Sequence, residues 1–281
     1  MRMTDFPLVS AVITTFNSSR WIERAIESAL SQSYPHIEVI VSDDGSNDDT
    51  VAKVLRYVQV DNRVRLLQSA TNSGLPAVAR NRAVKRANGS LLAFLDHDDV
   101  WFKKKIERQV VLMNRRPEIG MVHSHLLHTN NRSVALNLAR LEPPSWRVAN
   151  PESLSTRNVI QCSSVMIRAD LFANLGGFSE CHRFRAVEDF HLWIRVAQIA
   201  RIAFIREVHG GYTEHSGGIS KLGNPLEKAK ALDDEFGTSF SDKARSGKRY
   251  ATRIAALPFT WASYLNGAIR YKLGREPLSF D

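Results

Sequence analysis

The sequence predicts an α/β domain with a mostly parallel sheet flanked by helices, and two observations support this fold class. Short apolar stretches rich in β-branched residues alternate with segments whose apolar residues recur at helical spacing. These stretches are apolar on both faces, as expected for strands that helices cover on both sides. Because ligands bind at the carboxyl ends of the strands in such a sheet, the residues after each strand form the candidate site.

The alternation is clearest in the first hundred residues. A strand is expected at 8–15 (LVSAVITT), and Ser18 or Ser19 is expected to cap the helix that follows. Six residues of that helix recur at helical spacing: Trp21, Ile22, Ala25, Ile26, Ala29 and Leu30. The same criteria predict further strands at 37–41, 64–67 and 91–95, with helices beginning near Asp49 and running over 76–87.

The second half of the chain is less regular. Its predicted elements are strands at 119–127, 159–167 and 202–207, a polar connection over 130–151, a helix over 188–200, and a helical, basic tail after about Pro225. We therefore expect one domain over 1–225, with a nucleotide-binding half (1–100) and an acceptor half (101–225), followed by the tail (226–281).

Composition indicates an ordinary globular protein, since 43% of the 281 residues are hydrophobic and 24% are charged. No apolar run approaches the roughly 20 residues that a membrane helix needs. The N-terminal sequence lacks the layout of a signal peptide. Two cysteines, Cys162 and Cys181, do not make a disulfide framework. We therefore expect a reduced, cytoplasmic protein.

The formal net charge of +9 raises the question of an anionic partner. Basic residues are not interleaved with aromatic ones, so nucleic acid is not an expected partner. In the tail, five basic residues lie close to the apolar run IAALPFTWASYL: Lys243, Arg245, Lys248, Arg249 and Arg253. Either this segment makes a peripheral contact with the inner face of an anionic membrane, or it packs on the domain with its charges in water.

Three aspartates follow the strand at 91–95, in the sequence AFLDHDDVW. Carboxylates this close resist simultaneous ionisation, so they either open a solvated turn, with Asp99 capping a helix, or hold a cation. Asp96 and Asp98 are two residues apart in an extended segment, so both face one ligand. A hard cation such as Mg²⁺ or Mn²⁺ takes one or two carboxylates and completes its coordination with water and phosphate oxygens. The pattern therefore suits a metal-bound diphosphate.

A second acidic pair follows the strand at 37–41, in the sequence SDDGS. In a parallel sheet this pair lies near the three aspartates after 91–95. Asp43 and Asp44 suit the N–H of a nucleobase or a ribose hydroxyl, because a carboxylate accepts hydrogen bonds from both. The alternative is an Asx-turn with Gly45 at a special backbone angle, and one of the two aspartates is expected to form it.

Taken together, several stretches resemble a bacterial-type, inverting, non-processive glycosyltransferase of family 2 with the GT-A fold. They are VSAVITTFNSSRWIERAIESALSQSYPHIEVIVSDDGSNDDT, NSGLPAVARNRAV, GSLLAFLDHDDVW, CSSVMIRADLFANLGGFSE, AVEDFHLWIRV and YTEHSGGIS. They follow the family's order and spacing over roughly residues 7 to 220. The resemblance implies a Rossmann-like sheet and a nucleotide-sugar donor.

The resemblance also implies where the donor binds. Five residues match positions around the nucleotide base: Thr14, Thr15, Phe16, Asn17 and Asp44, the last of which hydrogen-bonds the base. Arg80, in the predicted helix over 76–87, is a candidate for a phosphate contact, although solvation at the surface is the alternative.

Asp96, His97 and Asp98 match the DxD motif, in which the first carboxylate meets the ribose and the last meets the metal. Some family members bind the metal with the following aspartate, so Asp99 remains a second candidate. His215, in YTEHSGGIS, matches a histidine that completes the metal or diphosphate site. The resemblance thus implies Mn²⁺ or Mg²⁺ as the cofactor.

Glu188 and Asp189 match the ED pair of the family, in which Glu188 would contact substrate and Asp189 would be the catalytic base. A carboxylate must take the proton of the acceptor hydroxyl on the face of the sugar opposite the leaving group. Asp189 starts a predicted helix, whose dipole favours an ionised carboxylate. Plain helix-start chemistry is the alternative reading of this pair. The QxxRW motif of processive synthases is absent, since FHLWIR follows Asp189.

The sequence therefore predicts the metal-dependent transfer of a single sugar from a nucleotide-sugar donor, expected to be a UDP-sugar. The expected acceptor is a glycan or a lipid-linked molecule, as in cell-surface polysaccharide synthesis. Two alternatives remain: a nucleotidyltransferase that makes nucleotide sugars and a catalytically silent sugar-nucleotide-binding module. No glycine-rich phosphate loop lies near the first strand, which argues against the nucleotidyltransferase.

Overall fold

The computed structural model describes residues 6–129, 146–148, 158–218 and 224–237. Its strands are β1 (Val9–Thr15), β2 (Ile37–Asp43), β3 (Val64–Gln68), β4 (Leu91–Asp96), β5 (Val100–Trp101), β6 (Ile119–Thr129), β7 (Trp146–Val148), β8 (Met166–Arg168) and β9 (Arg201–Thr213). Its α-helices are α1 (Ile22–Leu30), α2 (Thr50–Val60), α3 (Pro76–Val84), α4 (Lys105–Arg115), α6 (Ala169–Asn174), α7 (Glu188–Ile199) and α8 (Pro225–Phe236). Two 3₁₀ turns are η2 (Cys162–Ser164) and η3 (His182–Phe184).

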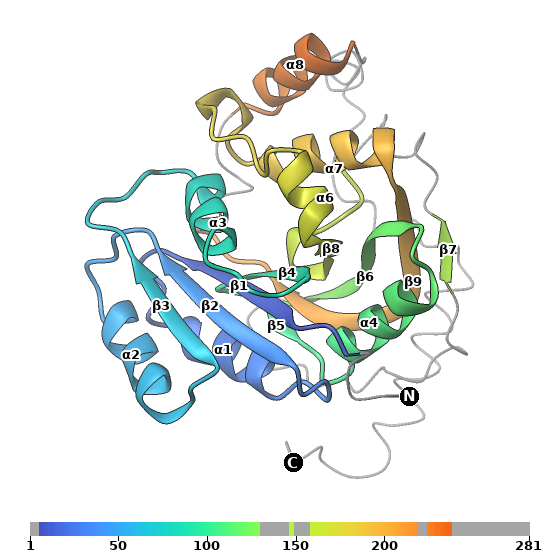
Figure 1. Cartoon of the computed structure of the whole chain (residues 1–281). Helices are drawn as coiled ribbons and strands as arrows, with labels where there is room; N and C mark the ends of the chain where they lie inside the picture. The colour runs from blue at the N-terminus through green and yellow to red at the C-terminus, as the bar shows by residue number, and fades with distance from the viewer. Residues whose placement is uncertain (1–5, 130–145, 149–157, 219–223, 238–281) are drawn as a thin grey trace, which may run out of the picture.

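The described strands form one nine-stranded sheet in the order β3-β2-β1-β4-β8-β6-β9-β5, with β7 paired to β9 (Figure 1). Strands β3, β2, β1 and β4 run parallel to one another, and β6 runs parallel to β9. The short strand β8 is antiparallel to both β4 and β6, so it joins the two parallel parts of the sheet. The predicted mixed α/β fold with a mostly parallel sheet is confirmed.

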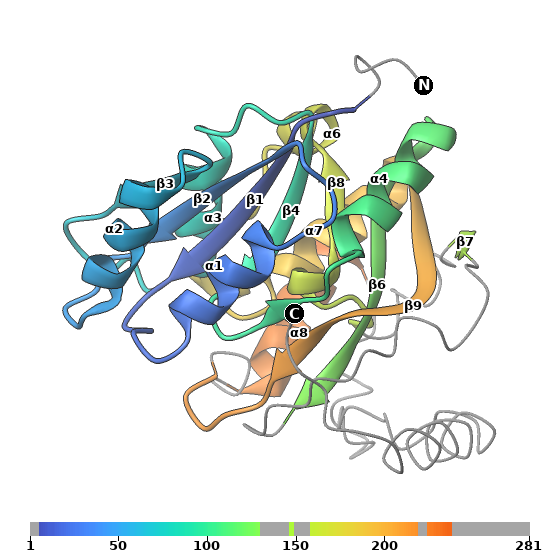
Figure 2. The same ribbon diagram turned by 90° about the horizontal axis from the view of Figure 1, so that it is seen from below.

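Helices cover both faces of this sheet, as the uniformly apolar strands predicted (Figure 2). Ala11 and Ile13 of β1 pack in a buried cluster with α1, α2 and α4, whereas Val12 packs in a second cluster with α3, α6 and α7. Successive residues of β1 thus pack into the two hydrophobic cores on opposite faces of the sheet. This leaves the carboxyl ends of β1, β2 and β4 as the edge where the polar loops gather.

Two local expectations were wrong. The strand predicted at 159–167 is replaced by the turn η2 and the three-residue strand β8. Ser164 Oγ donates to the carbonyl of Gln161 and so competes with a strand ladder. Helix α1 has no side-chain cap; instead the Ser18 carbonyl accepts hydrogen bonds from the amides of Trp21 and Ile22.

Other expectations fall partly outside the described residues. Strand β7 lies inside the polar connection predicted over 130–151, and the rest of that segment is not described. Helix α8 agrees with a helical start of the tail, with the Asn224 side chain accepting from the Leu226 amide. The five basic tail residues lie outside the described ranges. Within those ranges, none of the helices has the length and apolar character that crossing a membrane requires.

Candidate active site

Three polar loops meet because β1 pairs with β2 on one side and with β4 on the other. Thr14 is in register with Ser42 of β2 and Asp96 of β4, and Thr15 is in register with Asp43. The carboxyl ends of three neighbouring parallel strands therefore present the residues that the sequence selected.

The two aspartates of the SDDGS turn form different hydrogen bonds. Asp43 Oδ2 accepts hydrogen bonds from the amides of Gly45 (3.1 Å) and Ser46 (3.0 Å), which is the predicted Asx-turn. Gly45 has a φ of 81°, and a Cβ there would lie 2.7 Å from the carbonyl carbon of Thr71. Asp44 instead accepts from the Ser73 amide and hydroxyl through Oδ2. Its buried Oδ1 has no hydrogen-bond partner among the described residues.

The loop after β1 is fixed against this turn. The Thr15 carbonyl accepts a hydrogen bond from the Asp44 amide at 2.9 Å. Asn17 adopts a left-handed conformation with a φ of 46°, which asparagine tolerates, and its Oδ1 accepts from the Asn47 amide. Between them the Phe16 side chain is 39% exposed. The loop thus holds an open aromatic ring on a segment that is hydrogen-bonded to the SDDGS turn.

The aspartates after β4 also separate into distinct environments. Asp98 Oδ2 lies 2.7 Å from Nε2 of His215, although the two residues are 117 positions apart. The guanidinium of Arg24 on α1 donates to the Asp98 carbonyl and to the Thr213 hydroxyl, so it ties this turn to the end of β9. His97 Nδ1 lies 3.2 Å from the Thr14 carbonyl. No sequence pattern indicates this role of Arg24, because its partners come from distant segments.

Asp99 is buried behind this turn and does not cap a helix, because β5 follows it. Its Oδ1 accepts from the Thr213 amide (2.9 Å), and its Oδ2 lies 2.5 Å from the Ser163 hydroxyl. Burial, followed by the neighbouring Asp98, raises the pKa of Asp99 well above its ordinary value. Both oxygens of Asp99 are thus engaged within the protein.

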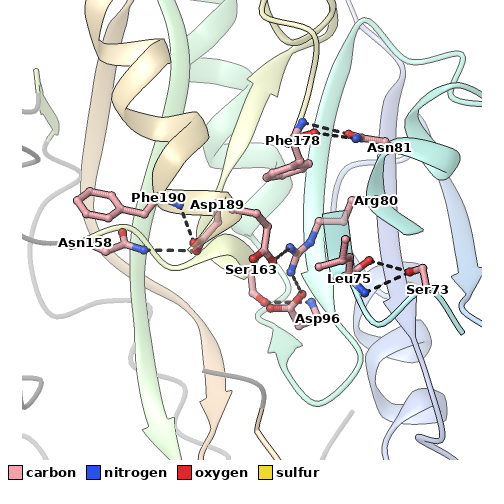
Figure 3. A network of polar contacts seen from close by, with 11 residues as sticks. Ser73, Leu75, Arg80, Asn81, Asp96, Asn158, Ser163, Phe178, Asp189 and Phe190 are labelled. Atoms are coloured by element: carbon pink, nitrogen blue, oxygen red, sulfur yellow. Dashed lines mark hydrogen bonds and ion pairs between the residues drawn. The ribbon is translucent and has the colours of Figure 1, made fainter. Parts of the chain in front are cut away.

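Arg80 joins the two sides of the site (Figure 3). Its Nη2 donates to Asp96 Oδ1 at 2.7 Å and its Nη1 donates to Glu188 Oε1 at 2.8 Å. The residue is 5% exposed, so the alternative of solvation at the surface is wrong. Asp96 is held further by its amide, which donates to the Ser163 hydroxyl.

Asp189 lies in the first turn of α7. Its Oδ1 accepts from the Phe190 amide at 2.6 Å, and Asn158 Nδ2 lies 3.4 Å from its Oδ2. Burial, then the neighbouring Glu188, raises the pKa of Asp189 from 3.8 to about 7. The helix dipole contributes about 1 kcal/mol or less, so the expected stabilisation of the ionised form is outweighed. The carboxyl therefore titrates near neutrality.

The donor set at Asp98 and His215 is compatible with a hard divalent cation. No group of three or more His, Cys, Asp or Glu side chains in the described ranges has the geometry to hold a metal unaided. Mg²⁺ and Mn²⁺ do not need one, because phosphate and water oxygens complete their coordination. The two side chains already converge within 2.7 Å, so they suit a cation that arrives with a diphosphate.

Comparison with known proteins identifies the class of protein that this fold and site define. The chain belongs to glycosyl transferase family 2, whose model matches residues 10–176. It is 32% identical over 203 residues to the UDP-Glc:alpha-D-GlcNAc-diphosphoundecaprenol beta-1,3-glucosyltransferase WfgD of Escherichia coli, covering 72% of this chain and 74% of WfgD. It is 44% identical over 115 residues to TuaG of Bacillus subtilis (strain 168), named as a teichuronic acid biosynthesis glycosyltransferase. That match covers 41% of this chain and 45% of TuaG, so it spans less than half the length of that relative.

Solved structures share the fold. The S. aureus TarS 1–349 complex with UDP-GlcNAc matches with a TM-score of 0.67 and 20% identity, over 93% of this chain and 79% of that chain. The Pyrobaculum calidifontis mannosyltransferase PcManGT in complex with GDP-Man and Mn²⁺ matches with a TM-score of 0.62 and 20% identity, over 97% and 76% of the two chains. The predicted family and the GT-A fold are confirmed.

Proposed function

We propose that this chain is an inverting, non-processive glycosyltransferase that transfers one sugar from a UDP-sugar to a glycan or lipid-linked acceptor with Mn²⁺ or Mg²⁺. The observation that carries the proposal is that Arg80 bridges Asp96, at the strand ends, and Glu188, the neighbour of Asp189. On the donor side, Asp98 lies beside His215 at the strand ends. On the other side, Asp189 has a pKa of about 7, which suits a general base near neutral pH.

The nucleotide would bind along the loops after β1 and β2. Oδ1 of Asp44 lies 3.8 Å from Nη1 of Arg82 but accepts no hydrogen bond from the described residues, so it is available to accept an N–H of the base. Phe16 offers a ring face for stacking. Thr14, Thr15 and Asn17 complete this wall. Asp96 Oδ2 accepts no hydrogen bond from the described residues and is available to a ribose hydroxyl, with His97 beside it.

The cation would be held by Asp98 and His215. Both oxygens of Asp99 already serve Thr213 and Ser163, which favours Asp98 of the two adjacent candidates. When bound there, the cation supplies positive charge that stabilises the departing diphosphate. Arg24 would keep the main chain of Asp98 in place through its hydrogen bond to the Asp98 carbonyl.

Asp189 would act on the acceptor. It takes the proton of an acceptor hydroxyl, whose oxygen attacks the anomeric carbon from the face opposite the leaving group. The bond between the anomeric carbon and the diphosphate breaks, and the configuration inverts. Asn158, beside Asp189 Oδ2, would orient the carboxyl toward the incoming hydroxyl. Glu188, paired with Arg80, lies next to this base.

The named relatives support the choice of donor and acceptor. WfgD carries UDP-Glc and a diphosphoundecaprenol-linked GlcNAc in its name, and TuaG is named for teichuronic acid biosynthesis. By similarity, we assign this chain a UDP-sugar, a lipid-linked or glycan acceptor, and a place in cell-surface polysaccharide synthesis. The cytoplasmic location and the peripheral membrane contact belong to the same proposal.

A donor-hydrolysis assay tests the function without knowledge of the acceptor. The purified protein is incubated with a panel of UDP-sugars and Mn²⁺, with EDTA-treated protein as the control. We expect one donor to release UDP and EDTA to abolish the release. In a parallel reaction with UTP and a sugar 1-phosphate in place of the UDP-sugar, release of pyrophosphate would indicate a nucleotidyltransferase. No release of UDP and no binding of any nucleotide sugar would contradict the proposal.

A further inference from the structure

Arg80 has an environment that neither a donor contact nor ordinary packing explains. Its guanidinium is almost completely buried, and two of its nitrogens each donate to a different carboxylate, Asp96 and Glu188. It also lies over the ring of Phe178, 5.3 Å from the ring centroid. Arginine keeps its charge when buried, so these partners must compensate that charge within the protein.

The two carboxylates belong to opposite sides of the proposed reaction. Asp96 ends β4 at the donor edge, and Glu188 begins α7 immediately before Asp189. The planar guanidinium offers its N–H groups in a fixed fork, so it sets the separation of the two carboxylates. A lysine ammonium supplies the same charge without that geometry.

The neighbouring residue strengthens the connection between the same two regions. Asn81 donates to the Phe178 carbonyl (2.9 Å) and to Glu180 (2.8 Å), and it accepts from the Phe178 amide (3.1 Å). A Cβ at Gly177, whose φ is 75°, would lie 2.8 Å from Oδ1 of Asn81. Helix α3 is thus fixed to the segment that leads into α7 by the hydrogen bonds of Asn81, and to Asp96 and Glu188 by Arg80.

We propose that Arg80 is a positioning residue that couples the donor-side Asp96 to the base-side Glu188, so that a correctly placed nucleotide and a correctly placed base support each other. Arg80 touches neither the donor nor the acceptor in this proposal. It acts through Asp96, which meets the ribose, and through Glu188, which precedes the base. The proposal rests on the function proposed above, since it requires a nucleotide at Asp96.

A set of coupled substitutions tests this role. One double-mutant cycle combines Asp96→Asn and Glu188→Gln in the protein that keeps Arg80. A second cycle combines the same two substitutions in the Arg80→Met protein. Two quantities are measured for each protein: the equilibrium constant of unfolding in urea and the affinity for UDP with Mn²⁺ by calorimetry. With Arg80 present, we expect the two carboxylate substitutions to be coupled by about tenfold in the unfolding constant. We also expect Glu188→Gln to weaken UDP binding by about threefold or more, although Glu188 is on the base side.

In the Arg80→Met proteins, the coupling between the two carboxylate substitutions should fall below about twofold, and so should the effect of Glu188→Gln on UDP affinity. The reason is that the connection between the carboxylates is then gone. Arg80→Lys should keep the charge and still lose most of the coupling. Arg195→Met is the matched control: Arg195, on α7, donates to the carbonyls of Leu175 and Gly177. It should reduce stability and leave UDP affinity unchanged.

The outcomes separate the inference from the function on which it rests. Coupling in the unfolding constant with no effect of Glu188→Gln on UDP affinity would overturn the positioning role and leave Arg80 a structural ion pair. The positioning role would also be overturned if Asp96→Asn and Glu188→Gln were coupled equally in proteins with and without Arg80. If the unsubstituted protein binds no nucleoside diphosphate with Mn²⁺, the proposed function itself fails, and the inference fails with it.

Discussion

The donor edge and the base side of this site are built in different ways. At the donor edge, Asp43 binds amides two and three positions away, and three neighbouring parallel strands bring the loops together. On the base side, the partners are distant: Glu188 meets Arg80 across 108 positions, and Asn158 meets Asp189 across 31. The part of the donor edge around Asp43 therefore follows from local turns and sheet topology, whereas the base side depends on long-range contacts. The Asp98–His215 pair of the donor edge, across 117 positions, is of the second kind.

One carboxylate in each region illustrates the difference. Asp48 lies in the loop between β2 and α2 at the donor edge. Although burial raises its pKa, hydrogen bonds from Thr50 and Ser19 outweigh burial and lower that pKa to about 2. For Asp189, burial and the adjacent Glu188 outweigh the favourable contacts and raise the pKa to about 7. The surroundings of Asp48 thus stabilise its charged form, whereas those of Asp189 favour its neutral form.

The largest expected effect is on turnover in Asp189→Asn. A general base typically contributes about 10²–10⁴-fold to rate, and the amide cannot accept the acceptor's proton. We expect turnover to fall by that factor. Glu188→Gln should reduce turnover less, because successive helical residues point in different directions. Initial rates of UDP release with the active donor measure both.

Asp170→Asn is the control for helix-start chemistry. Asp170 lies in the first turn of α6, and its Oδ1 accepts from the Leu171 amide at 2.7 Å, much as Asp189 accepts from Phe190. Normal turnover is expected for this variant. Near-normal turnover of Asp189→Asn as well would remove Asp189 as the base and direct attention to Glu188.

The second prediction concerns the buried hydrogen bonds of Asp99. Asp99→Ala leaves the Thr213 amide and the Ser163 hydroxyl without their partner, at a cost of about 1–3 kcal/mol in unfolding free energy. Asp99→Asn should cost far less, because burial raises the pKa of Asp99 and an amide resembles its neutral acid. Urea unfolding at neutral pH distinguishes them. An equal loss in both variants would show that the charge of Asp99 matters.

The third prediction uses the opposite pKa shifts of Asp189 and Asp48. Because the folded pKa of Asp189 is raised, the stability from its neutral form is complete below about pH 4 and lost as pH rises through 7. Asp189→Asn should therefore gain stability relative to the unsubstituted protein between pH 5 and pH 8. The folded pKa of Asp48 is lowered, so its stabilisation is present above about pH 4 and lost toward pH 2. Asp48→Asn should therefore be destabilising at both pH values.

The raised pKa of Asp189 also predicts the pH dependence of the reaction. Because Asp189 must be ionised to accept a proton, kcat/KM should rise between pH 6 and 8 as a single group with a pKa of about 7 ionises. A profile that is flat over this range would contradict the assignment of Asp189 as the group that titrates.

The smallest expected effect is at the entry to α7. Ala186 has a φ of 65°, a left-handed conformation that costs a non-glycine residue about 1–2 kcal/mol. Ala186→Gly removes this strain but adds freedom to the unfolded chain, worth about 0.4–1 kcal/mol. A net stabilisation of about 0.5 kcal/mol is expected from urea unfolding. A loss of stability would mean that the methyl group packs favourably against its surroundings.

The difference between local and long-range contacts explains which features the sequence could predict. The strands and helices from residue 8 to 96 were placed within a few residues, because each has its own periodicity and each loop follows a strand. Strand β8 was missed because three residues carry no pattern, and its pairing with β4 and β6 is antiparallel. The Arg80 bridge was missed because a lone arginine in a helix does not indicate partners at Asp96 and Glu188. The raised pKa of Asp189 depends on burial, which the chain order does not encode locally.

The central claim is that donor binding and proton removal reside in different regions. It is tested most directly by titrating UDP, with and without Mn²⁺, into the unsubstituted protein, Asp98→Asn and Asp189→Asn. Loss of the Mn²⁺-dependent part of UDP affinity is expected in Asp98→Asn, because water cannot replace the charge of a ligating carboxylate. Asp189→Asn should bind UDP and Mn²⁺ within a few-fold of the unsubstituted protein while its turnover collapses. Equal loss of nucleotide affinity in the two variants would contradict the account.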